Sequence, residues 1–222
     1  MTQKRALVIA PHADDEAFGM GGTILKLVRE GWAVKTVVVC CGDSFVFEHS
    51  GSRVTRAERK AELAAVSAAF GVSWNMLRFD QDSLMDTVPI RDVISAIEFV
   101  QDGFRADRWY VTGPSTHQDH RVVYEATMAA ARIGRKNTPA EVLLYELPMY
   151  CMNHAPWRFN PNLYENVAQF IDEKIRISSL YASQVRPTGP LSPQRLREWA
   201  VACGSEFGID AAERFEVVRV LR

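Results

Sequence analysis

The segment Ala6-Leu7-Val8-Ile9-Ala10 is a continuous run of apolar residues, and Pro11-His12-Ala13-Asp14-Asp15-Glu16 follows it directly. Such a run is typical of a strand that is buried on both faces of a parallel sheet. Residues 23–30 show a helical spacing of apolar residues, and Val34 to Cys41 is a second apolar run. A strand, a helix and a strand in this order predict a right-handed βαβ unit.

The remainder of the chain continues this alternation. We expect an α/β, Rossmann-like three-layer fold in which helices flank a mostly parallel sheet. No repeat or linker interrupts the pattern, and 222 residues are typical of one domain, so we assign residues 1–222 to a single domain. Further helices are predicted at 56–70, 90–104, 119–133, 174–181 and 192–207, further strands at 75–79, 109–112, 142–147, 166–171 and 214–221, and a loop at 43–55.

Composition and charge exclude several classes of protein. Hydrophobic residues amount to 47% and charged residues to 24%, which is ordinary for a globular chain. The net charge of -1 gives no reason to expect nucleic acid as a partner, and no apolar stretch approaches the roughly 20 residues that span a bilayer. We therefore expect a cytoplasmic protein without membrane insertion, and the sequence is compatible with a homo-oligomer. The cysteines, which form no Cys-x-x-Cys pair, are predicted to be reduced thiols: Cys40, Cys41, Cys151 and Cys203.

Ionisable residues are concentrated where the first predicted strand ends, at His12, Asp14, Asp15 and Glu16. Adjacent carboxylates repel one another and raise each other's pKa, and a bound divalent cation removes that conflict. Imidazole and carboxylate are both good zinc ligands. One helical turn would put His12 and Asp15 on the same side and leave Asp14 free to act on water. The alternative is that the acidic residues simply favour the N-terminus of the following helix.

A second cluster follows the strand predicted at 109–112. His117 and His120 are spaced to face one way in a first helical turn, with Asp119 between them. Both clusters follow strands at their carboxyl ends, which is where open α/β sheets bind ligands. The alternative is a polar first turn of a helix in which Asp119 balances the charge of the histidines.

The segment Gly19-Met20-Gly21-Gly22 admits two interpretations. Its backbone N–H groups could bind phosphate at the N-terminus of a helix, as in a metal-free nucleotide-binding module. The segment lacks the Gly-x-Gly-x-x-Gly spacing and the Gly-Lys-Ser/Thr of phosphate-binding loops. We therefore interpret the glycines as a tight turn into a helix that begins at Thr23, with nucleotide binding as the weaker alternative.

The segments Pro11 to Glu16 and His117-Gln118-Asp119-His120 resemble the signature motifs of the LmbE-like, or PIG-L, family of zinc-dependent N-acetyl-sugar deacetylases. Ala13 and Gln118 depart from the commoner residues of that family, and Ser115 stands where some members carry a tyrosine. Weaker similarities, without an assigned role, are Arg59-x-x-Glu62, Asp82, Tyr145-Glu146, Tyr181-x-Ser183-Gln184 and Ala212-Glu213-x-Phe215.

The resemblance implies a role for each ionisable residue of the two motifs. Asp14 is the general base, and His117 stabilises the oxyanion or acts as an acid. Asp119 is the partner that orients a ligand histidine. The ligands of the implied Zn²⁺, with Fe²⁺ as the alternative metal, are His12, Asp15 and His120.

The resemblance further implies an enzyme that removes an N-acetyl group from an N-acetylglucosamine-type sugar or sugar conjugate, which is a small-molecule substrate. Arg53 and Arg56, in the predicted loop near the same edge of the sheet, are candidate substrate-binding residues for hydroxyl or phosphate oxygens. A solvated basic loop is the alternative for these two arginines. The same metal site would serve a hydrolase of another amide, non-sugar or with a larger acyl group, so this alternative stays open.

Overall fold

The centre of the molecule is a seven-stranded sheet. The structure is a computed structural model, and it describes residues 3–45, 53–80, 84–150 and 158–222. The strands, in their order across the sheet, are β5 (Ser73–Phe79), β2 (Ala33–Cys40), β1 (Arg5–Ala10), β6 (Arg108–Thr112), β7 (Glu141–Tyr145), β9 (Ala212–Val220) and β8 (Leu163–Asn166). The first five strands are parallel, and β9 and β8 join antiparallel at one edge.

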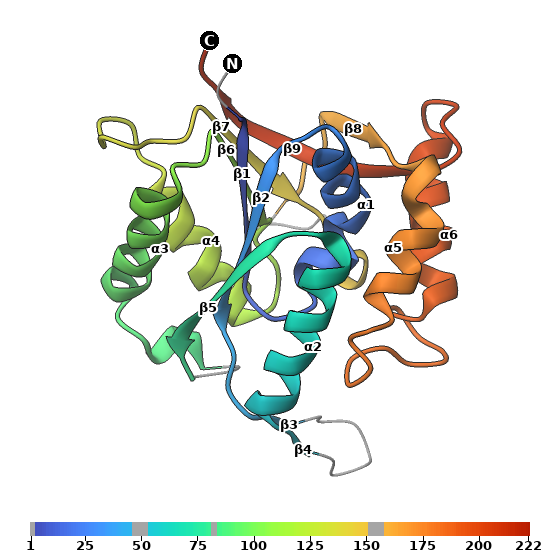
Figure 1. Cartoon of the computed structure of the whole chain (residues 1–222), viewed down its shortest axis with the longest axis horizontal. Helices are drawn as coiled ribbons and strands as arrows, with labels where there is room; N and C mark the ends of the chain where they lie inside the picture. The colour runs from blue at the N-terminus through green and yellow to red at the C-terminus, as the bar shows by residue number, and fades with distance from the viewer. Residues whose placement is uncertain (1–2, 46–52, 81–83, 151–157) are drawn as a thin grey trace.

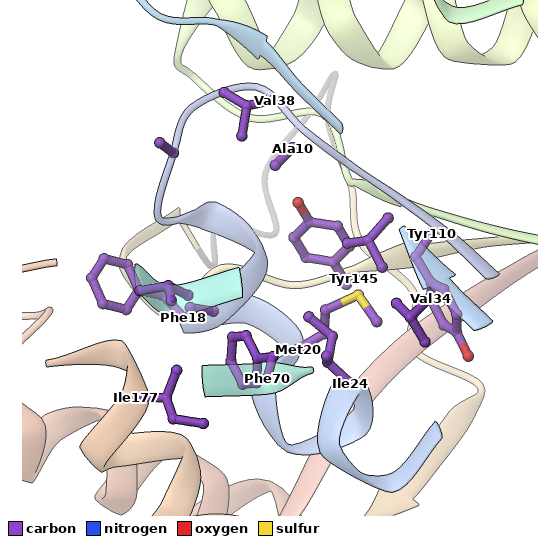
Figure 2. Close-up of a cluster of buried hydrophobic side chains, with 14 of the residues drawn as sticks. Ala10, Phe18, Met20, Ile24, Val34, Val38, Phe70, Tyr110, Tyr145 and Ile177 are labelled. Carbon is purple, nitrogen blue, oxygen red and sulfur yellow. The ribbon is translucent and has the colours of Figure 1, made fainter. Parts of the chain in front are cut away.

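Helices cover both faces of the sheet, so the expected α/β three-layer fold is confirmed (Figure 1). On one face lie α1 (Asp15–Arg29), α2 (Arg56–Phe70), α5 (Ile171–Ser178) and α6 (Pro193–Ser205), and on the other α3 (Ile90–Phe104) and α4 (Gln118–Ala130). Each face has its own apolar core. Figure 2 shows the core under α1, where Phe18, Met20 and Ile24 pack towards Tyr145 and Phe70.

Strand β1 lies at the middle of the sheet and organises its carboxyl edge. Residues 6–10 are completely buried, as the apolar run predicts. The chain proceeds from β1 to β2 and β5 on one side, and then crosses to β6 on the other side of β1. The strand order therefore reverses between β1 and β6, which is where sheets of this kind open a crevice for ligands.

Helix α1 differs from the expected tight turn, because it begins at Asp15 and runs through the glycine segment. The predicted start at Thr23 was therefore wrong. The helix is kinked at Met20, whose φ of -142° is not helical. Beyond the kink, the N–H groups of Gly22 and Thr23 donate to the carboxylate of Glu213 at 2.9 and 2.7 Å instead of to a preceding turn.

The glycines of α1 are required by close packing. A Cβ atom on Gly19 would lie 2.5 Å from the ring of Tyr145, and one on Gly22 would lie 2.8 Å from the side chain of Val167. These neighbours come from segments that lie far along the chain, so the pattern was misread as turn chemistry. The segment brings helix and sheet together rather than reversing the chain.

Other element boundaries were predicted with mixed success. Helices α2 and α3 have the predicted bounds, and α2 begins with a capping box at Thr55 and ends at Gly71 in the left-handed conformation. The predicted strand 166–171 was wrong, because the Asn166 side chain accepts from the amide of Ala168 and ends β8 there, ahead of a 3₁₀ turn (Ala168–Phe170). The predicted loop 43–55 contains the short antiparallel pair β3 (Ser44–Phe45) and β4 (Arg53–Val54).

The predictions about the cysteines and about membrane-spanning segments can be compared with the described residues. Cys40, Cys41 and Cys203 are buried thiols, as predicted, and Cys151 lies outside the described residues. Within the described ranges, none of the helices has the length and apolar character needed to cross a membrane.

Candidate metal centre

The two ionisable clusters of the sequence meet at the carboxyl edge of neighbouring strands. His12 lies in the loop after β1, and His117 and His120 lie at the start of α4, shortly after β6. Because β1 and β6 are paired parallel strands, their carboxyl ends place the three rings together. The ring centroid of His12 is 4.9 Å from that of His117 and 5.3 Å from that of His120. The strand order thus brings His12 close to His117 and His120, although roughly a hundred residues separate them in sequence.

Three of the predicted residues form a group that could hold a metal ion. The candidate ligand atoms of His12, Asp15 and His120 all lie within 4.8 Å of one another, and all three side chains are buried. Asp15 Oδ2 lies 3.5 Å from His12 Nδ1 and 3.6 Å from His120 Nε2. Ligand atoms of a tetrahedral zinc, each bonded at about 2.1 Å, lie about 3.4 Å apart. The spacing of this group therefore fits Zn²⁺.

The hydrogen bonds behind the rings leave the correct nitrogens for a cation. His12 Nε2 lies 2.9 Å from Asp119 Oδ2, so that nitrogen carries the proton and Nδ1 presents a lone pair to Asp15. His120 Nδ1 lies 3.1 Å from Ser115 Oγ, and the buried Nε2 of His120 has no hydrogen-bond partner among the described residues. A buried nitrogen without a partner is costly unless a ligand completes it, and here a cation would do so.

The ionisation states of the group also suit a metal. Burial lowers the pKa of His120 to about 3, so its imidazole is neutral. Burial would raise the pKa of Asp15, but the facing histidines and the His12 amide, which donates to Oδ2 at 2.9 Å, lower it to about 2. A neutral imidazole and an ionised carboxylate are the forms that bind metal.

Asp14 lies next to this group in a strained backbone conformation. Its φ of 147° is in the region that residues other than glycine rarely adopt, and its side chain makes no capping bond although it occupies the N-cap of α1. Burial and the charge of Asp15 together raise the pKa of Asp14 well above its ordinary value. The positive charge of Arg59 acts in the opposite direction but does not cancel this rise. The hypothesis of one helical turn from His12 to Asp15 was wrong, because α1 starts at Asp15 and an irregular turn precedes it.

His117 caps helix α4, and its ring also lies beside the other two histidines. Its Nδ1 accepts from the backbone N–H of Asp119 at 3.2 Å, which makes His117 the N-cap of α4. The proton of the neutral ring is therefore on Nε2. The ring is half-buried and stacks on His120 with centroids 4.9 Å apart. His117 therefore has a structural role as the N-cap of α4, and its ring also lies against the proposed ligand His120.

Asp119 is placed behind His12. It is completely buried, its Oδ2 accepts from His12, and its Oδ1 accepts from the Met85 amide at 3.0 Å. This arrangement of metal ligand, carboxylate and backbone amide fixes the orientation of the His12 ring, as such carboxylates do in metal sites.

The two arginines proposed to bind substrate are less informative. Arg56 forms an ion pair with Asp80, and its backbone amide donates to Asp43 at 2.8 Å. The pairing makes it part of the surface between α2 and β5. The side chain of Arg53 lies outside the described residues, as does Asp82. The structure therefore does not bring Arg56 together with the histidines.

A tyrosine that the sequence did not single out borders the histidines. The ring of Tyr150, in a 3₁₀ turn (Pro148–Tyr150) after β7, lies 4.9 Å from that of His120 and 6.0 Å from that of His117. Burial raises the pKa of its hydroxyl, so Tyr150 is a neutral donor. The segment has no periodic pattern, and therefore nothing in the sequence pointed to this residue.

The weaker similarities are buried contacts that support the site. Tyr181 donates its hydroxyl hydrogen to Glu16. Ser183 donates its backbone and hydroxyl hydrogens to Glu62, both at 2.7 Å. Glu213 binds Lys174 Nζ at 2.7 Å in addition to the amides of α1. Those amides are thereby occupied, so the glycine segment is not a phosphate site and the nucleotide-binding alternative loses its basis.

Comparison with known proteins is consistent with this geometry. The family model described as GlcNAc-PI de-N-acetylase, PIG-L, matches residues 7–131, which include both clusters and more than half of the chain. The chain belongs to the PIG-L family. Its relatives include the uncharacterized deacetylase YaiS of Escherichia coli (strain K12), which is 26% identical over 176 residues that cover 75% of this chain and 84% of YaiS. The family resemblance inferred from the motifs is thus confirmed.

Solved structures share the fold of this PIG-L family member. N,N'-diacetylchitobiose deacetylase from Pyrococcus horikoshii superimposes with a TM-score of 0.77 and 21% identity, over 97% of this chain and 84% of that one. The 4-carboxy-2-hydroxymuconate hydratase GalB of Pseudomonas putida KT2440 superimposes with a TM-score of 0.72 and 20% identity, over 99% of each chain. A deacetylase and a hydratase therefore share this fold, and the reaction has to be argued from the site.

Proposed function

We propose that this PIG-L family member is a zinc-dependent deacetylase that removes the N-acetyl group from an N-acetylglucosamine-type sugar or sugar conjugate. The observation that carries the proposal is the convergence of His12 Nδ1, Asp15 Oδ2 and His120 Nε2. Next to them in sequence is Asp14, which has a strained backbone and does not cap the helix with its carboxylate. Three protein ligands leave a coordination position open, as in catalytic rather than structural zinc sites.

Each side chain has one task in the proposed mechanism. A bound divalent metal polarises a carbonyl oxygen and lowers the pKa of water. The Asp14 carboxylate takes a proton from the attacking water and later returns it to the leaving amine nitrogen, acting as general base and then as general acid. Acetate and a free amine are the products.

His117 stabilises the negative charge that develops on the carbonyl oxygen. Its Nδ1 accepts from the Asp119 amide, so its Nε2–H is the proposed donor to that oxygen. A donor aimed at a developing oxyanion lowers the activation free energy by about 3 to 4 kcal/mol. Tyr150, whose ring lies beside that of His117, is a second candidate donor through its hydroxyl.

A narrow cavity beside His120 favours acetyl over larger acyl groups. It has a volume of about 20 Å³, and Leu147, Tyr150, Phe159 and Pro114 are among the residues that line it. Such a volume accommodates one water molecule or one methyl group. An acetyl methyl group directed into it would fit, whereas a longer acyl chain would meet the aromatic walls. The deacetylation of N,N'-diacetylchitobiose by a protein of the same fold supports an amino sugar as the amine part.

Two other reactions remain alternatives. A hydrolase of another amide would use the same ligands and the same base, and it would differ in the cavity and in the residues that contact the amine part. A hydratase is favoured by the likeness to GalB, at 20% identity. In that reaction water adds to a carbon–carbon double bond and no acyl group is released, so the products separate the classes.

The decisive experiment is an acetate-release screen over N-acetylated sugars. The protein is first stripped with a chelator and then reloaded with Zn²⁺ or Fe²⁺ in separate arms. We expect acetate from at least one N-acetylglucosamine derivative, dependent on the metal. Release of a larger acid, or of acid from a non-sugar amide alone, would support the broader amide hydrolase. Absence of any acid, with hydration of an unsaturated carboxylate, would overturn the proposal.

A further inference from the structure

Asp14 occupies a helix N-cap without using it, which requires an explanation. Aspartate at this position ordinarily accepts from the second or third amide of the helix. Here the carbonyl of Asp14 accepts from Ala17 and Phe18 at 3.1 and 3.0 Å, yet its carboxylate makes no capping bond. Its φ of 147° costs free energy, about 1–3 kcal/mol for such backbone conformations. Surrounding contacts have to hold the residue in this state.

The peptide group between Ala13 and Asp14 is held at both of its polar ends. The Ala13 carbonyl accepts from Arg59 Nη2 at 3.2 Å, and the Asp14 N–H donates to Glu16 Oε2 at 3.2 Å. Rotation of this peptide group changes the φ of Asp14 directly. The two buried side chains of Arg59 and Glu16 therefore hold the backbone angle at which the Asp14 carboxylate does not cap the helix.

Glu16 is in turn held by a residue that is distant in sequence. Its second oxygen, Oε1, accepts the hydroxyl hydrogen of Tyr181, and both side chains are almost completely buried. The Tyr181 ring packs edge-on against Phe18, with centroids 6.2 Å apart. The backbone of Tyr181 is anchored by the Ser178 carbonyl, which accepts its amide at 3.1 Å. The hydroxyl is therefore rigidly placed, and it fixes the rotation of the Glu16 carboxylate.

We propose that Tyr181 is a positioning residue that, through Glu16, holds the Ala13–Asp14 peptide in the strained orientation which aims the Asp14 carboxylate at the reacting water. The kinetic part of this inference rests on the proposed function, in which Asp14 is the base. Without the hydroxyl, the Glu16 carboxylate is free to rotate about its last bond, and Asp14 relaxes towards a conformation in which it caps α1. The ring of Tyr181 packs in the apolar core, and its hydroxyl oxygen fixes the orientation of the Glu16 carboxylate.

The first test compares Tyr181→Phe with the matched variant Tyr110→Phe. Each removes one hydroxyl from a completely buried ring, but the Tyr110 hydroxyl accepts from Arg108 at 3.0 Å on strand β6 and has no link to Asp14. We expect Tyr181→Phe to lower kcat about tenfold with KM within twofold and zinc stoichiometry unchanged. Tyr110→Phe is expected to keep its kcat. An unchanged kcat in Tyr181→Phe, or an equal loss in both variants, overturns the inference.

A second test separates positioning from a general structural role. In an Asp14→Ala background, Tyr181→Phe should lower the residual rate by less than twofold, because the residue that it positions is gone. A further tenfold loss in that background would show that Tyr181 acts on the protein by another route, and would contradict the proposal.

A third test does not depend on activity. Hydrogen exchange of the Asp14 amide, which donates to Glu16, is followed by NMR in the metal-free protein. We expect about tenfold faster exchange in Tyr181→Phe, while the Cys40 amide, which donates to Pro11 at 2.9 Å, exchanges as before. If no substrate is ever found, this measurement still decides whether Tyr181 holds Asp14. Equal Asp14 exchange in both proteins overturns the inference.

Discussion

Two buried polar clusters lie along helix α1, and they differ in whether the protein completes them. At the kink, Glu213 accepts from Lys174 Nζ and from two amides of the helix, at 2.7 to 2.9 Å. At the N-terminal end of α1, nitrogens of His12 and His120 approach Asp15 Oδ2 at 3.5 and 3.6 Å, and the buried Nε2 of His120 has no hydrogen-bond partner among the described residues. At Glu213 the buried polar groups are paired within the protein, whereas the buried Nε2 of His120 needs a ligand such as a cation to satisfy it. The contrast distinguishes a structural from a functional carboxylate.

The largest effect is expected from Asp14→Ala, in the functional cluster. Loss of the base should lower kcat by about three orders of magnitude, as general acid–base groups commonly contribute. The zinc content, measured by elemental analysis, should stay near one equivalent, because Asp14 is not among the proposed ligands. A variant with near-normal turnover would show that Asp14 is not the base.

The second prediction breaks the structural cluster. Glu213→Ala leaves the ammonium group of Lys174, which is 3% exposed, without its partner, and should lower the free energy of unfolding by about 3 kcal/mol. Urea denaturation measures this change. The matched control is Glu173→Ala, whose ion pair with Arg176 is on the surface and should contribute less than about 1 kcal/mol. Equal losses in the two variants would remove the distinction between the clusters.

Zinc should complete the functional cluster and stabilise the protein. At a free concentration about one hundred times Kd, the free energy of unfolding should rise by about 2.7 kcal/mol. The same addition to His120→Ala should produce little change, because one of the three ligands is missing. Thermal unfolding of the two metal-free proteins, with and without Zn²⁺, measures the difference. Equal stabilisation of both proteins would refute the role of His120 as a ligand.

The smallest effect concerns the cavity beside the functional cluster. Leu147→Ala should enlarge it and raise the kcat/KM ratio of propionyl to acetyl substrate about tenfold, the usual effect of one methylene group in an apolar pocket. Leu77→Ala, in β5 at the far edge of the sheet, should leave the ratio unchanged. If neither variant alters the ratio, the acyl group does not enter this cavity.

Much of the fold could be predicted from local sequence patterns. The apolar runs identified the central strands, and the helix predicted at 56–70 has the observed bounds because its caps, Thr55 and Gly71, are its neighbours in sequence. Helix α1 was misjudged because the reason for its glycines is the approach of Tyr145 and Val167, which lie more than a hundred residues away. Local patterns carry no information about such contacts.

In the candidate site, too, some residues could be predicted from the sequence and others could not. Both motifs could be found because imidazole and carboxylate groups at strand ends are unusual without a ligand. Tyr150 follows β7 in a segment without periodicity, and Tyr181 is 165 residues from Glu16, so neither role could be derived. The strained φ of Asp14 is a property of one peptide group, and side chains from distant elements hold it.

The bond from Glu213 to the amides of α1 has a consequence for protein synthesis. The proposed catalytic base directly precedes the first helix, but the acceptor for the kink of that helix is on β9, 191 residues after Gly22, and Tyr181 follows Glu16 by 165 residues. While the ribosome is still making residues 171–220, the early βαβ unit lacks both contacts. Helix α1 therefore lacks these contacts until β9 has been made, and the site is expected to reach its final geometry only after β9 has emerged from the ribosome.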